Sequence, residues 1–522
     1  MLGSTATLAA QDAPTFRLRE VRVTTAEIFD ADDPRPLTKL ATALHWQTRE
    51  ATVARELWFG AGDRIDAATA AELERNLRAL GLFADVAVRL VPTGTPGEAD
   101  LEVTTRDRLT LNFGAGASYV GGVTGFRASI GENNLFGTGD RIALSFTENS
   151  DGEYRGGFAF TDLHVLDSWH TATLRAAKTD EGDSYGLDVR RPFKHLSDPR
   201  AHSFALSHDE AEADYYRGGD SVAEVPYSRS AIGGDVTWTA GPPADRWTWG
   251  AELRGDTITY ERARGPLGPQ IRVPGDTHSV FFGPTASWRS IRAFRKVEGL
   301  DTLVYVQDIT LGTSLGTSFG ARWRDEDGRG GAMQPEFGVN AGWTGEPLAQ
   351  AFVRIGVNGG VRLDDGDAVG WLAGASLRAF WLANDAHTFG VGSTFDAVAE
   401  TQNLPAELTL GEDNGLRGYR ARLLSGTRRL RTNVEHRFDT GIEFATLHFG
   451  TVAFFDVGHV GDGDESGRPF SSAGAGLRIG SKPLFGEGVL RIDVSKPFDD
   501  VVEQSDGWKV SLSVGQVFTF GG

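Results

Sequence analysis

Residues 109–120 read LTLNFGAGASYV, and their side chains alternate without a break between two kinds. The apolar set comprises Leu109, Leu111, Phe113, Ala115, Ala117 and Tyr119, and the small or polar set comprises Thr110, Asn112, Gly114, Gly116 and Ser118. Successive side chains of a β-strand point to opposite faces, so this stretch predicts a strand with one apolar and one polar face. Segments of about ten residues with this alternation are typical of strands in a transmembrane barrel, which leaves no backbone edge in lipid.

The same alternation recurs to the end of the chain, in DRIALSFT, YRGGFAFTDL, WHTATLRAA, RTNVEHRF, VLRIDVSKPF and WKVSLSVGQVFTF. Some connections are tight, such as GG at 121–122, and others are long and acidic, such as ENSDGE from 148 and GDGDESGRP from 461. Short turns at one rim and long loops at the other are typical of such barrels. A soluble β-propeller would show a repeat of about 40 to 50 residues, and none is visible. We therefore predict an all-β, antiparallel transmembrane barrel over residues 108–522.

The composition excludes other classes. The chain has 522 residues, no cysteine and a formal net charge of −19, which argues against binding nucleic acid. It contains no run of about 18 apolar residues, the length that a membrane helix needs. The absence of cysteine is compatible with passage through an oxidising compartment. Residues 1–15, which include MLGSTATLAAQDAP, are either the remnant of a signal peptide or a disordered terminus.

Residues 16–107 differ from the rest and predict a small α+β domain. A strand starts at Phe16, with a phase shift at Arg19 and Glu20, and two more strands cover 83–91 and 99–105. Between them, one helix is expected from a cap at Thr48 to Gly60. A second helix is capped by Asp66, ends at Gly81 and has an apolar stripe of Ala70, Leu73, Leu77 and Leu80.

Several motifs could suggest catalysis or metal binding, but their context does not support either. The G-x-S-x-G pattern of hydrolases occurs at Ser314 and Ser318, within a segment that keeps alternating instead of turning into a helix. We expect these serines to face the lumen and Leu311, Leu315, Phe319 and Trp323 to face lipid. The acidic clusters lack the spacing of a calcium loop, and the histidines lack that of a zinc helix. No catalytic residue, metal site or cofactor is predicted, and the chain is not expected to be an enzyme.

The stretch GEDNGLRGYRARLLSGT, residues 411–427, interrupts the strands. It contains Leu416, Arg417, Gly418 and Tyr419, and a strand after it contains F-x-D-x-G at Phe454, Asp456 and Gly458. Together these motifs resemble the V/L/I-R-G-F/Y loop and its partner strand in the superfamily of outer-membrane insertases and translocators, which is the BamA/TamA-like and surface antigen family. ENNLFGTGD at 132–140 adds to this resemblance, and RELWFGAGDRID with LRALGLFADVAV resembles a POTRA domain.

The resemblance implies that a loop spanning 398–426 folds back into the barrel, where Arg417 pairs with Asp456. It also implies sixteen strands, eleven before the loop and five after it. We count five alternating runs after the loop but about fifteen before it. We therefore expect about sixteen wall strands, with some runs between 205 and 350 forming hairpins in outer loops.

The last strand, WKVSLSVGQVFTF, must pair with the first to close the barrel. It is expected to point Trp508, Val510, Leu512, Val514, Phe518 and Phe520 toward lipid. Glycine weakens strands, so Gly114, Gly116 and Gly515, together with Phe518 and Phe520, mark a predicted lateral seam. An open seam could pair with a strand of a client protein by β-augmentation.

These features predict an outer-membrane protein of a Gram-negative bacterium, with one periplasmic POTRA domain, that inserts or translocates proteins. A dedicated exporter of the two-partner type is an alternative, and a passive pore or a lipid-handling barrel is another. The expected partners are outer-membrane lipids, unfolded barrel or secreted clients, and periplasmic accessory factors that bind the POTRA domain. No nucleic acid is expected among them.

Overall fold

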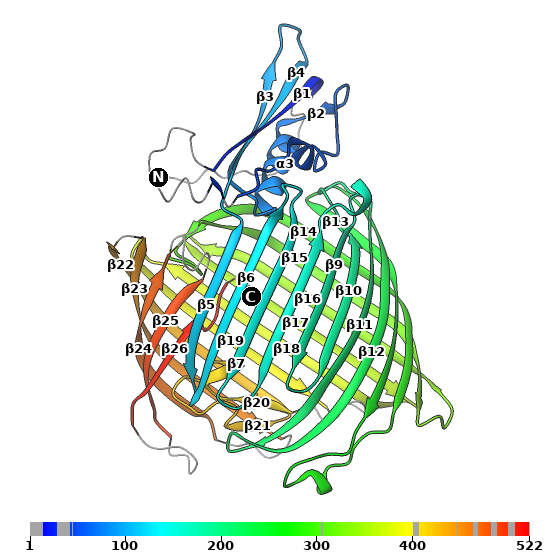
Figure 1. Ribbon diagram of the computed structural model, residues 1–522, viewed down its shortest axis with the longest axis vertical. Helices are drawn as coiled ribbons and strands as arrows, with labels where there is room; N and C mark the ends of the chain where they lie inside the picture. Colours follow the sequence, from blue (N-terminus) through cyan, green and yellow to red (C-terminus); the bar gives the residue numbers. More distant parts are fainter. Residues whose placement is uncertain are drawn as a thin grey trace.

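The computed structural model has a small N-terminal domain seated on one rim of a large β-barrel (Figure 1). It describes residues 14–28, 42–43, 45–303, 306–399, 407–444, 446–462, 468–481, 488–499 and 507–520. Most of the predicted terminal segment 1–15 lies outside this set. Among the described residues, no helix is both long and apolar enough to cross a membrane. We call the rim that carries the N-terminal domain the near rim and the opposite one the far rim.

The N-terminal domain contains a four-stranded sheet with the order β2-β1-β4-β3. Its strands are β1 (Phe16–Ala26), β2 (Arg64–Ile65), β3 (Phe83–Pro92) and β4 (Glu98–Asp107). Strands β1 and β4 run parallel, whereas β3 and β4 are antiparallel. The pairing of β1 with β4 shifts between Leu18 and Val21, which confirms the phase shift predicted at Arg19 and Glu20. The shift lets both ends of β1 turn apolar side chains toward one core.

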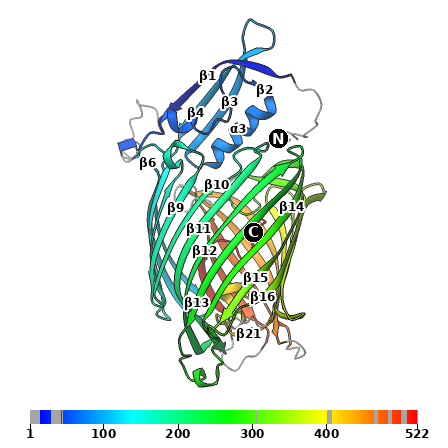
Figure 2. The same ribbon diagram turned by 90° about the vertical axis from the view of Figure 1, so that its right-hand side faces the viewer.

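Two helices cover this sheet, as predicted (Figure 2). Helix α3 (Ala67–Ala79) is capped by Asp66, whose Oδ1 accepts a hydrogen bond from the Thr69 amide at 2.8 Å. Its buried face packs into the core of the domain. Helix α2 (Glu50–Ala54) is shorter than predicted, and Thr48 does not cap it. The Thr48 amide instead donates to Oδ2 of Asp107 at 2.6 Å, which ties the helix to the end of β4.

The N-terminal domain contacts three near-rim turns, which are 136–139, 163–170 and 192–199. The hydroxyl of Thr52 donates to the carbonyl of Gly137 at 2.8 Å. The buried carboxylate of Glu56 lies 2.7 Å from Nε2 of His164 and 3.2 Å from Nζ of Lys194. These contacts tie the domain to turns contributed by six consecutive barrel strands.

Glu56 and His195 are among the groups at this junction whose pKa values are shifted. Burial alone would raise the pKa of Glu56, but the hydrogen bond from His164 and the charge of Lys194 outweigh it, so the pKa is lowered. His195 stacks on Trp58, with ring centroids 4.9 Å apart, and burial lowers the pKa of its imidazole. The docked domain therefore favours an ionised Glu56 and a neutral His195.

The barrel is closed and antiparallel, and the described residues supply twenty strands. These strands are β5 (Leu111–Val120), β6 (Val123–Leu135), β7 (Asp140–Asn149), β8 (Tyr154–Asp162), β9 (Thr171–Thr179), β10 (Asp183–Arg191), β11 (Arg200–Arg217), β12 (Asp220–Ala240), β13 (Asp245–Tyr260), β14 (Thr277–Glu298), β15 (Val306–Glu326), β16 (Ala332–Leu348), β17 (Ala351–Asp364), β18 (Asp367–Leu382), β19 (His387–Val398), β22 (Arg428–Phe444), β23 (Leu447–Gly461), β24 (Phe470–Gly480), β25 (Val489–Pro497) and β26 (Lys509–Val514). Short 3-10 turns occur at η1 (Val165–Asp167), η2 (Gly268–Gln270) and η3 (Glu412–Asn414).

The expectation of about sixteen strands is therefore wrong. Fifteen strands precede the loop and five follow it, as the alternating runs themselves had suggested. The runs between 205 and 350 are not separate hairpins in outer loops but belong to the wall strands β11 to β16, which have 16 to 22 residues each. About ten residues of a tilted strand suffice to cross a bilayer, so these strands continue well beyond it.

The outward faces of the strands carry exposed apolar side chains, including Leu315, Phe319 and Trp323 as predicted. Ser314 and Ser318 lie within the uninterrupted strand β15, without a nucleophile elbow. The predicted distribution of turns is wrong. The tight turn at 121–122 and the acidic turn after Asn149 both lie at the far rim, because they follow β5 and β7, which run in the same direction.

Candidate functional site

Residues 407–426, between β19 and β22, fold into the barrel from the far rim. Within this segment, β20 (Leu408–Leu410) pairs with β21 (Leu424–Gly426), and η3 and the Leu-Arg-Gly-Tyr motif lie between them. Gly415 and Gly418 flank Leu416 and Arg417 with φ of +103° and +88°, values that favour glycine. Leu416, Arg417 and Tyr419 are almost completely buried. We call residues 407–426 the internal loop.

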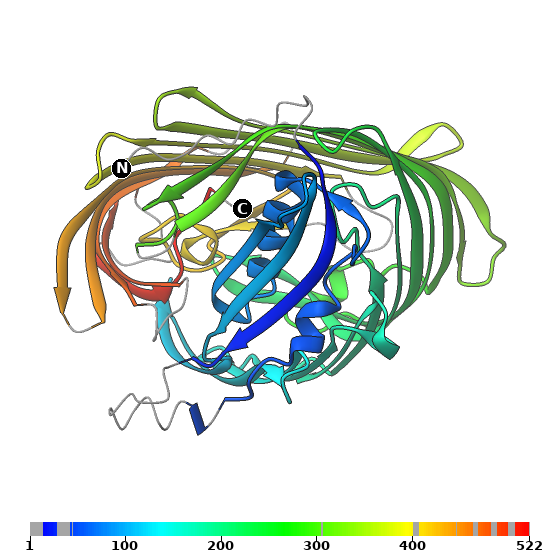
Figure 3. The same cartoon turned by 90° about the horizontal axis from the view of Figure 1, so that it is seen from above.

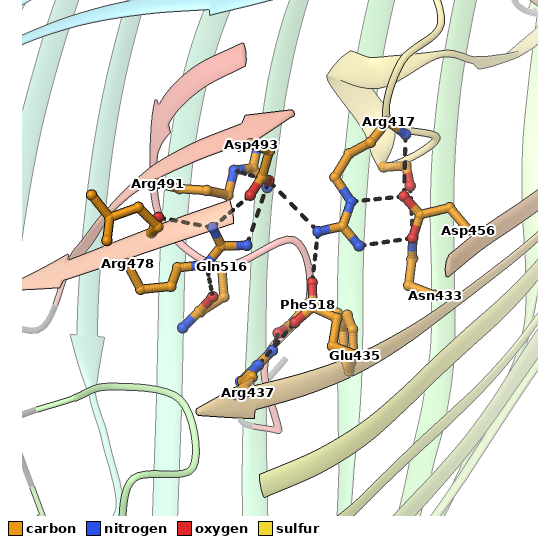
Figure 4. A network of polar contacts seen from close by, with 12 residues as sticks. Arg417, Asn433, Glu435, Arg437, Asp456, Arg478, Arg491, Asp493, Gln516 and Phe518 are labelled. Carbon is orange, nitrogen blue, oxygen red and sulfur yellow. Dashed lines mark hydrogen bonds and ion pairs between the residues drawn. The ribbon is translucent and has the colours of Figure 1, made fainter. Parts of the chain in front are cut away.

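Arg417 is held in the lumen by carboxylates from three strands of the wall, β22, β23 and β25 (Figure 4). Its Nε donates to Oδ2 of Asp456 at 2.7 Å and its Nη2 to Oδ1 of the same carboxylate at 2.8 Å. The remaining nitrogen, Nη1, donates to Oε1 of Glu435 at 2.8 Å and lies 3.6 Å from Oδ2 of Asp493. All four side chains are fully buried. The arginine thus makes a bidentate pair with Asp456 and a third charged bond with Glu435.

The other residues of the F-x-D-x-G motif complete this contact. Phe454, Asp456 and Gly458 are two residues apart on β23, so they face the lumen together. The guanidinium of Arg417 lies 3.5 Å from the centroid of the Phe454 ring. A methyl group on Gly458 would lie 2.5 Å from Cδ2 of Leu410, so only glycine leaves room for the internal loop here.

The ion pair belongs to a larger network in which the sequence had pointed only to Arg417 and Asp456. Asn433 donates to Asp456 at 2.7 Å and also to the carbonyl of Gly415 at 2.7 Å. Arg437 donates to Glu435 at 2.9 Å, and Arg478 donates to Asp493 at 2.6 Å. Asn433, Glu435 and Arg437 alternate in RTNVEHRF, so their common lumenal face was detectable from the sequence. Their partners were not, because these come from other strands.

The outer part of the internal loop reaches the start of the barrel. Glu412 accepts a hydrogen bond from the amide of Gly121 at 2.9 Å, and the amide of Ala421 donates to the carbonyl of Gly121 at 3.0 Å. The hydroxyl of Tyr419 donates to the carbonyl of Ser471 at 2.7 Å, on the other side of the last two strands. The internal loop therefore spans the lumenal side of the junction between β26 and β5.

That junction is weakly paired. Strand β26 pairs with β25 through six residue pairs, and β5 pairs with β6 through ten, but β26 and β5 share only Leu512 with Tyr119. Gly114 and Gly116 lie on β5, outside this single pair. Gly515 follows the last residue of β26, with φ of +106°. The structure thus places these three glycines beside or directly after the weak junction.

Phe518 and Phe520 are not where the alternation of the last strand placed them. Both are buried, at 6% and 3% exposure, in an apolar cluster within the lumen, so the predicted orientation toward lipid is wrong. The physical reason is the turn at Gly515, where the chain leaves the wall and enters the barrel. We call residues 515–520 the tail.

Residues 134–518 match the Omp85 superfamily domain, which is well over half of the chain. The chain belongs to the Omp85 superfamily. This membership confirms the resemblance drawn from the loop and strand motifs and identifies an outer-membrane β-barrel from a superfamily associated with protein insertion and transport. None of the curated proteins compared matches the sequence.

Three solved structures are among those that match this chain. BamA from Haemophilus ducreyi, lacking POTRA domains 1-3, is 12% identical with a TM-score of 0.44, over 95% of this chain and 84% of that one. CdiB from Acinetobacter baumannii is 14% identical with a TM-score of 0.47, covering 95% and 74%. CdiB from Escherichia coli is 11% identical with a TM-score of 0.49, covering 95% and 76%.

Proposed function

We propose that this protein inserts barrel proteins into the outer membrane through a lateral seam between β26 and β5, with its N-terminal POTRA domain in the periplasm. The observation that carries the proposal is the single residue pair, Leu512 with Tyr119, that joins these strands. Every other neighbouring strand pair of the barrel shares at least six pairs within the described residues. The wall is thus weakest at one place.

The edge of β5 is suited to receiving a client strand. No described residue pairs with 111–118 on the side of β26, so the N–H and C=O groups that point to that side can pair with an incoming strand. Main-chain hydrogen bonds provide affinity without demanding a particular sequence. A cavity of about 660 Å³ adjoins the seam, lined by residues that include Gly116, Ser118, Ser513 and Val514. It offers space for the client segment beside the seam.

The internal loop supports this mechanism because it is attached both to the barrel wall and to the first turn of the barrel. Arg417 anchors it to strands β22 and β23 of the wall, and Glu412 and Ala421 anchor it to the first turn of the barrel. The loop thereby positions β5 at the seam. We further propose that β3, a ten-residue strand at the edge of the N-terminal sheet, pairs with clients or accessory factors before they reach the barrel.

A disulfide across the seam tests the proposal. Tyr119→Cys with Leu512→Cys places two cysteines at directly paired positions, about 4.5 to 5.5 Å apart between Cα atoms, which a disulfide can bridge. The chain has no other cysteine, so the product is unambiguous. Leu187→Cys with Leu206→Cys, which joins β10 to β11, is the matched control in a fully paired part of the wall.

Both variants are reconstituted in liposomes with an unfolded barrel client, whose folding is followed by gel migration. We expect the oxidised seam variant to lose insertion, to recover it on reduction, and the control to remain active throughout. Insertion that continues through a locked seam refutes the mechanism. A dedicated exporter would behave differently, because a secreted client that passes through the lumen would still cross the liposome membrane with the seam locked.

A further inference from the structure

The tail lies in the lumen, bound to the inner side of the barrel wall. Beyond Gly515 it forms no strand with the wall, and it buries two rings that are two residues apart, Phe518 and Phe520. Phe380 contacts both rings, at centroid distances of 5.4 Å and 6.0 Å, and Phe352 lies 6.2 Å from Phe520. The barrel wall therefore presents a pair of aromatic rings to an aromatic-x-aromatic segment.

The wall also makes room for the first of these rings. Gly390 and Gly392 lie on the lumenal face of β19, next to Phe380 on β18. A methyl group on Gly392 would lie 2.7 Å from Cδ2 of Phe518, and one on Gly390 would lie 3.3 Å from its Cζ. Two glycines thus form a flat cradle that any larger residue would fill.

The main chain of the tail is held by charged side chains. Arg437 donates to the carbonyl of Phe518 at 2.9 Å, and Arg354 donates to the carbonyl of Phe520 at 3.1 Å. The amide of Phe520 donates to Oδ1 of Asp301 at 2.5 Å. These groups recognise backbone atoms that every peptide has, while the cradle recognises rings. Nε of Arg478 also donates to the side-chain oxygen Oε1 of Gln516 at 3.2 Å.

The β14–β15 hairpin contributes the third side of the site. Strand β15 pairs with β16 only between Gly312 and Arg324, although its pairing with β14 continues to Val306. The paired ends of β14 and β15 therefore leave the wall and cross the near-rim opening (Figure 3). Leu311, predicted to face lipid, is instead buried in the aromatic cluster. The reason is a register shift after Ile291, which accompanies the inward turn.

We propose that this hairpin and the cradle form a binding site for an aromatic-x-aromatic segment of a client polypeptide, and that the chain's own tail occupies it as a competing ligand. The identity of the client rests on the proposed insertase function. Strands of outer-membrane barrels alternate lipid-facing residues and carry aromatic girdles, so two rings spaced two residues apart are a common feature of such clients. This chain has the same spacing at Phe158 and Phe160.

The tail links this site to the seam. Strand β26 ends at Val514, so the tail residues that could continue its pairing are held in the lumen instead. A client segment that displaces the tail would release it at the point where β26 meets β5. The site thus couples the arrival of a client at the near rim to the state of the seam.

Peptide binding to the full-length protein in detergent tests the proposal. The probe is a fluorescent peptide Gln-Val-Phe-Thr-Phe, and Gln-Val-Ala-Thr-Ala is its control. A tethered tail competes at an effective concentration of roughly millimolar, so the wild-type protein should bind the probe weakly. Phe518→Ala with Phe520→Ala removes the competing rings and should tighten probe binding by about tenfold or more. Adding Gly392→Val should abolish the gain, and the control peptide should not bind at all.

A measurement on the intact tail covers the case in which these variants fold poorly. Val517→Cys introduces the only thiol of the chain, packed beside the aromatic cluster. Excess aromatic peptide should raise the rate at which a bulky maleimide modifies this thiol, and Gly392→Val should raise it without peptide. The proposal is overturned if the rate of maleimide modification does not change, or if the variant with Phe518→Ala and Phe520→Ala binds the probe no more tightly than the wild type. Neither readout requires insertion. A protein that binds the peptide as expected but does not insert the barrel client in liposomes would therefore refute the insertase function alone.

Discussion

Removing the Arg417 side chain should release the internal loop from the wall. Arg417→Ala removes the arginine that pairs with the buried carboxylate of Asp456 and one of the two arginines that donate to the buried carboxylate of Glu435. Breaking a buried ion pair in this way costs about 3 to 5 kcal/mol. Since about 1.4 kcal/mol corresponds to a factor of ten, the equilibrium constant for local opening of the loop should rise roughly a hundredfold to several thousandfold.

Hydrogen exchange followed by mass spectrometry measures this opening directly. The amides of Leu416 and Ala421 are hydrogen-bonded to Gly411 and Gly121, so peptides covering 411–424 report on the loop. Their exchange should accelerate in Arg417→Ala, while peptides from β10 and β11 remain protected and show that the barrel is intact. Arg417→Lys keeps the charge but cannot form the bidentate pair, so its exchange should lie between those of wild type and Arg417→Ala.

Arg420→Ala is the matched control within the same loop. Arg420 pairs with Asp220, and the side chains are 38% and 68% exposed. Exposed ion pairs contribute at most about 1 kcal/mol, so exchange should change by about fivefold or less. If Arg417→Ala accelerates exchange no more than Arg420→Ala does, the buried network does not hold the loop.

Three further changes have defined outcomes. Docking of the N-terminal domain should weaken in two steps as the pH falls. Below about 6.5 it weakens because the docked state lowers the pKa of His195 and so favours the neutral imidazole. Below about 4.5 it weakens again because the docked state lowers the pKa of Glu56 and so favours the ionised carboxylate. Energy transfer between dyes at Thr95→Cys and Asp385→Cys would measure this, and a flat profile would contradict it. Asp66→Ala should destabilise the N-terminal domain by about 1 kcal/mol through loss of the helix cap, a difference detectable by urea unfolding of that domain. Gly458→Ala should lower the free energy of opening of the internal loop by about 1 to 3 kcal/mol, because the added methyl group would overlap Leu410. The same exchange experiment measures this, and unchanged exchange would show that the wall can adjust.

Local patterns in the sequence predicted the elements of this fold well. Alternation located the strands because the strand period is two, and the stripe and cap at Asp66 located α3. The number of alternating runs agreed with the twenty strands, and it was the sixteen-strand plan of similar proteins that misled. A count taken from the chain's own periodicity was therefore the better guide to the size of the barrel.

Patterns were a poorer guide to where strands leave the wall. Leu311 and Phe518 keep the alternation of lipid-facing residues, yet both are buried inside the barrel. Alternation determines on which side of a strand a residue lies, but a bulge after Ile291 and a turn at Gly515 change what that side faces. The pairing of Arg417 with Asp456 came from a motif, whereas Glu435 and Asp493 required the three-dimensional arrangement of four strands.

A wall of twenty strands has a consequence for the cell's resistance to harmful solutes. Barrels of sixteen to eighteen strands already enclose an aqueous channel, so a wider one needs material inside it. Here the internal loop enters from the far rim, the β14–β15 hairpin crosses near the opposite opening, and the tail lies between them. Because these obstructions come from separate parts of the chain, displacing one of them would leave the other two to restrict leakage of antibiotics and detergents. Sensitivity to such compounds would then require at least two of them to fail together.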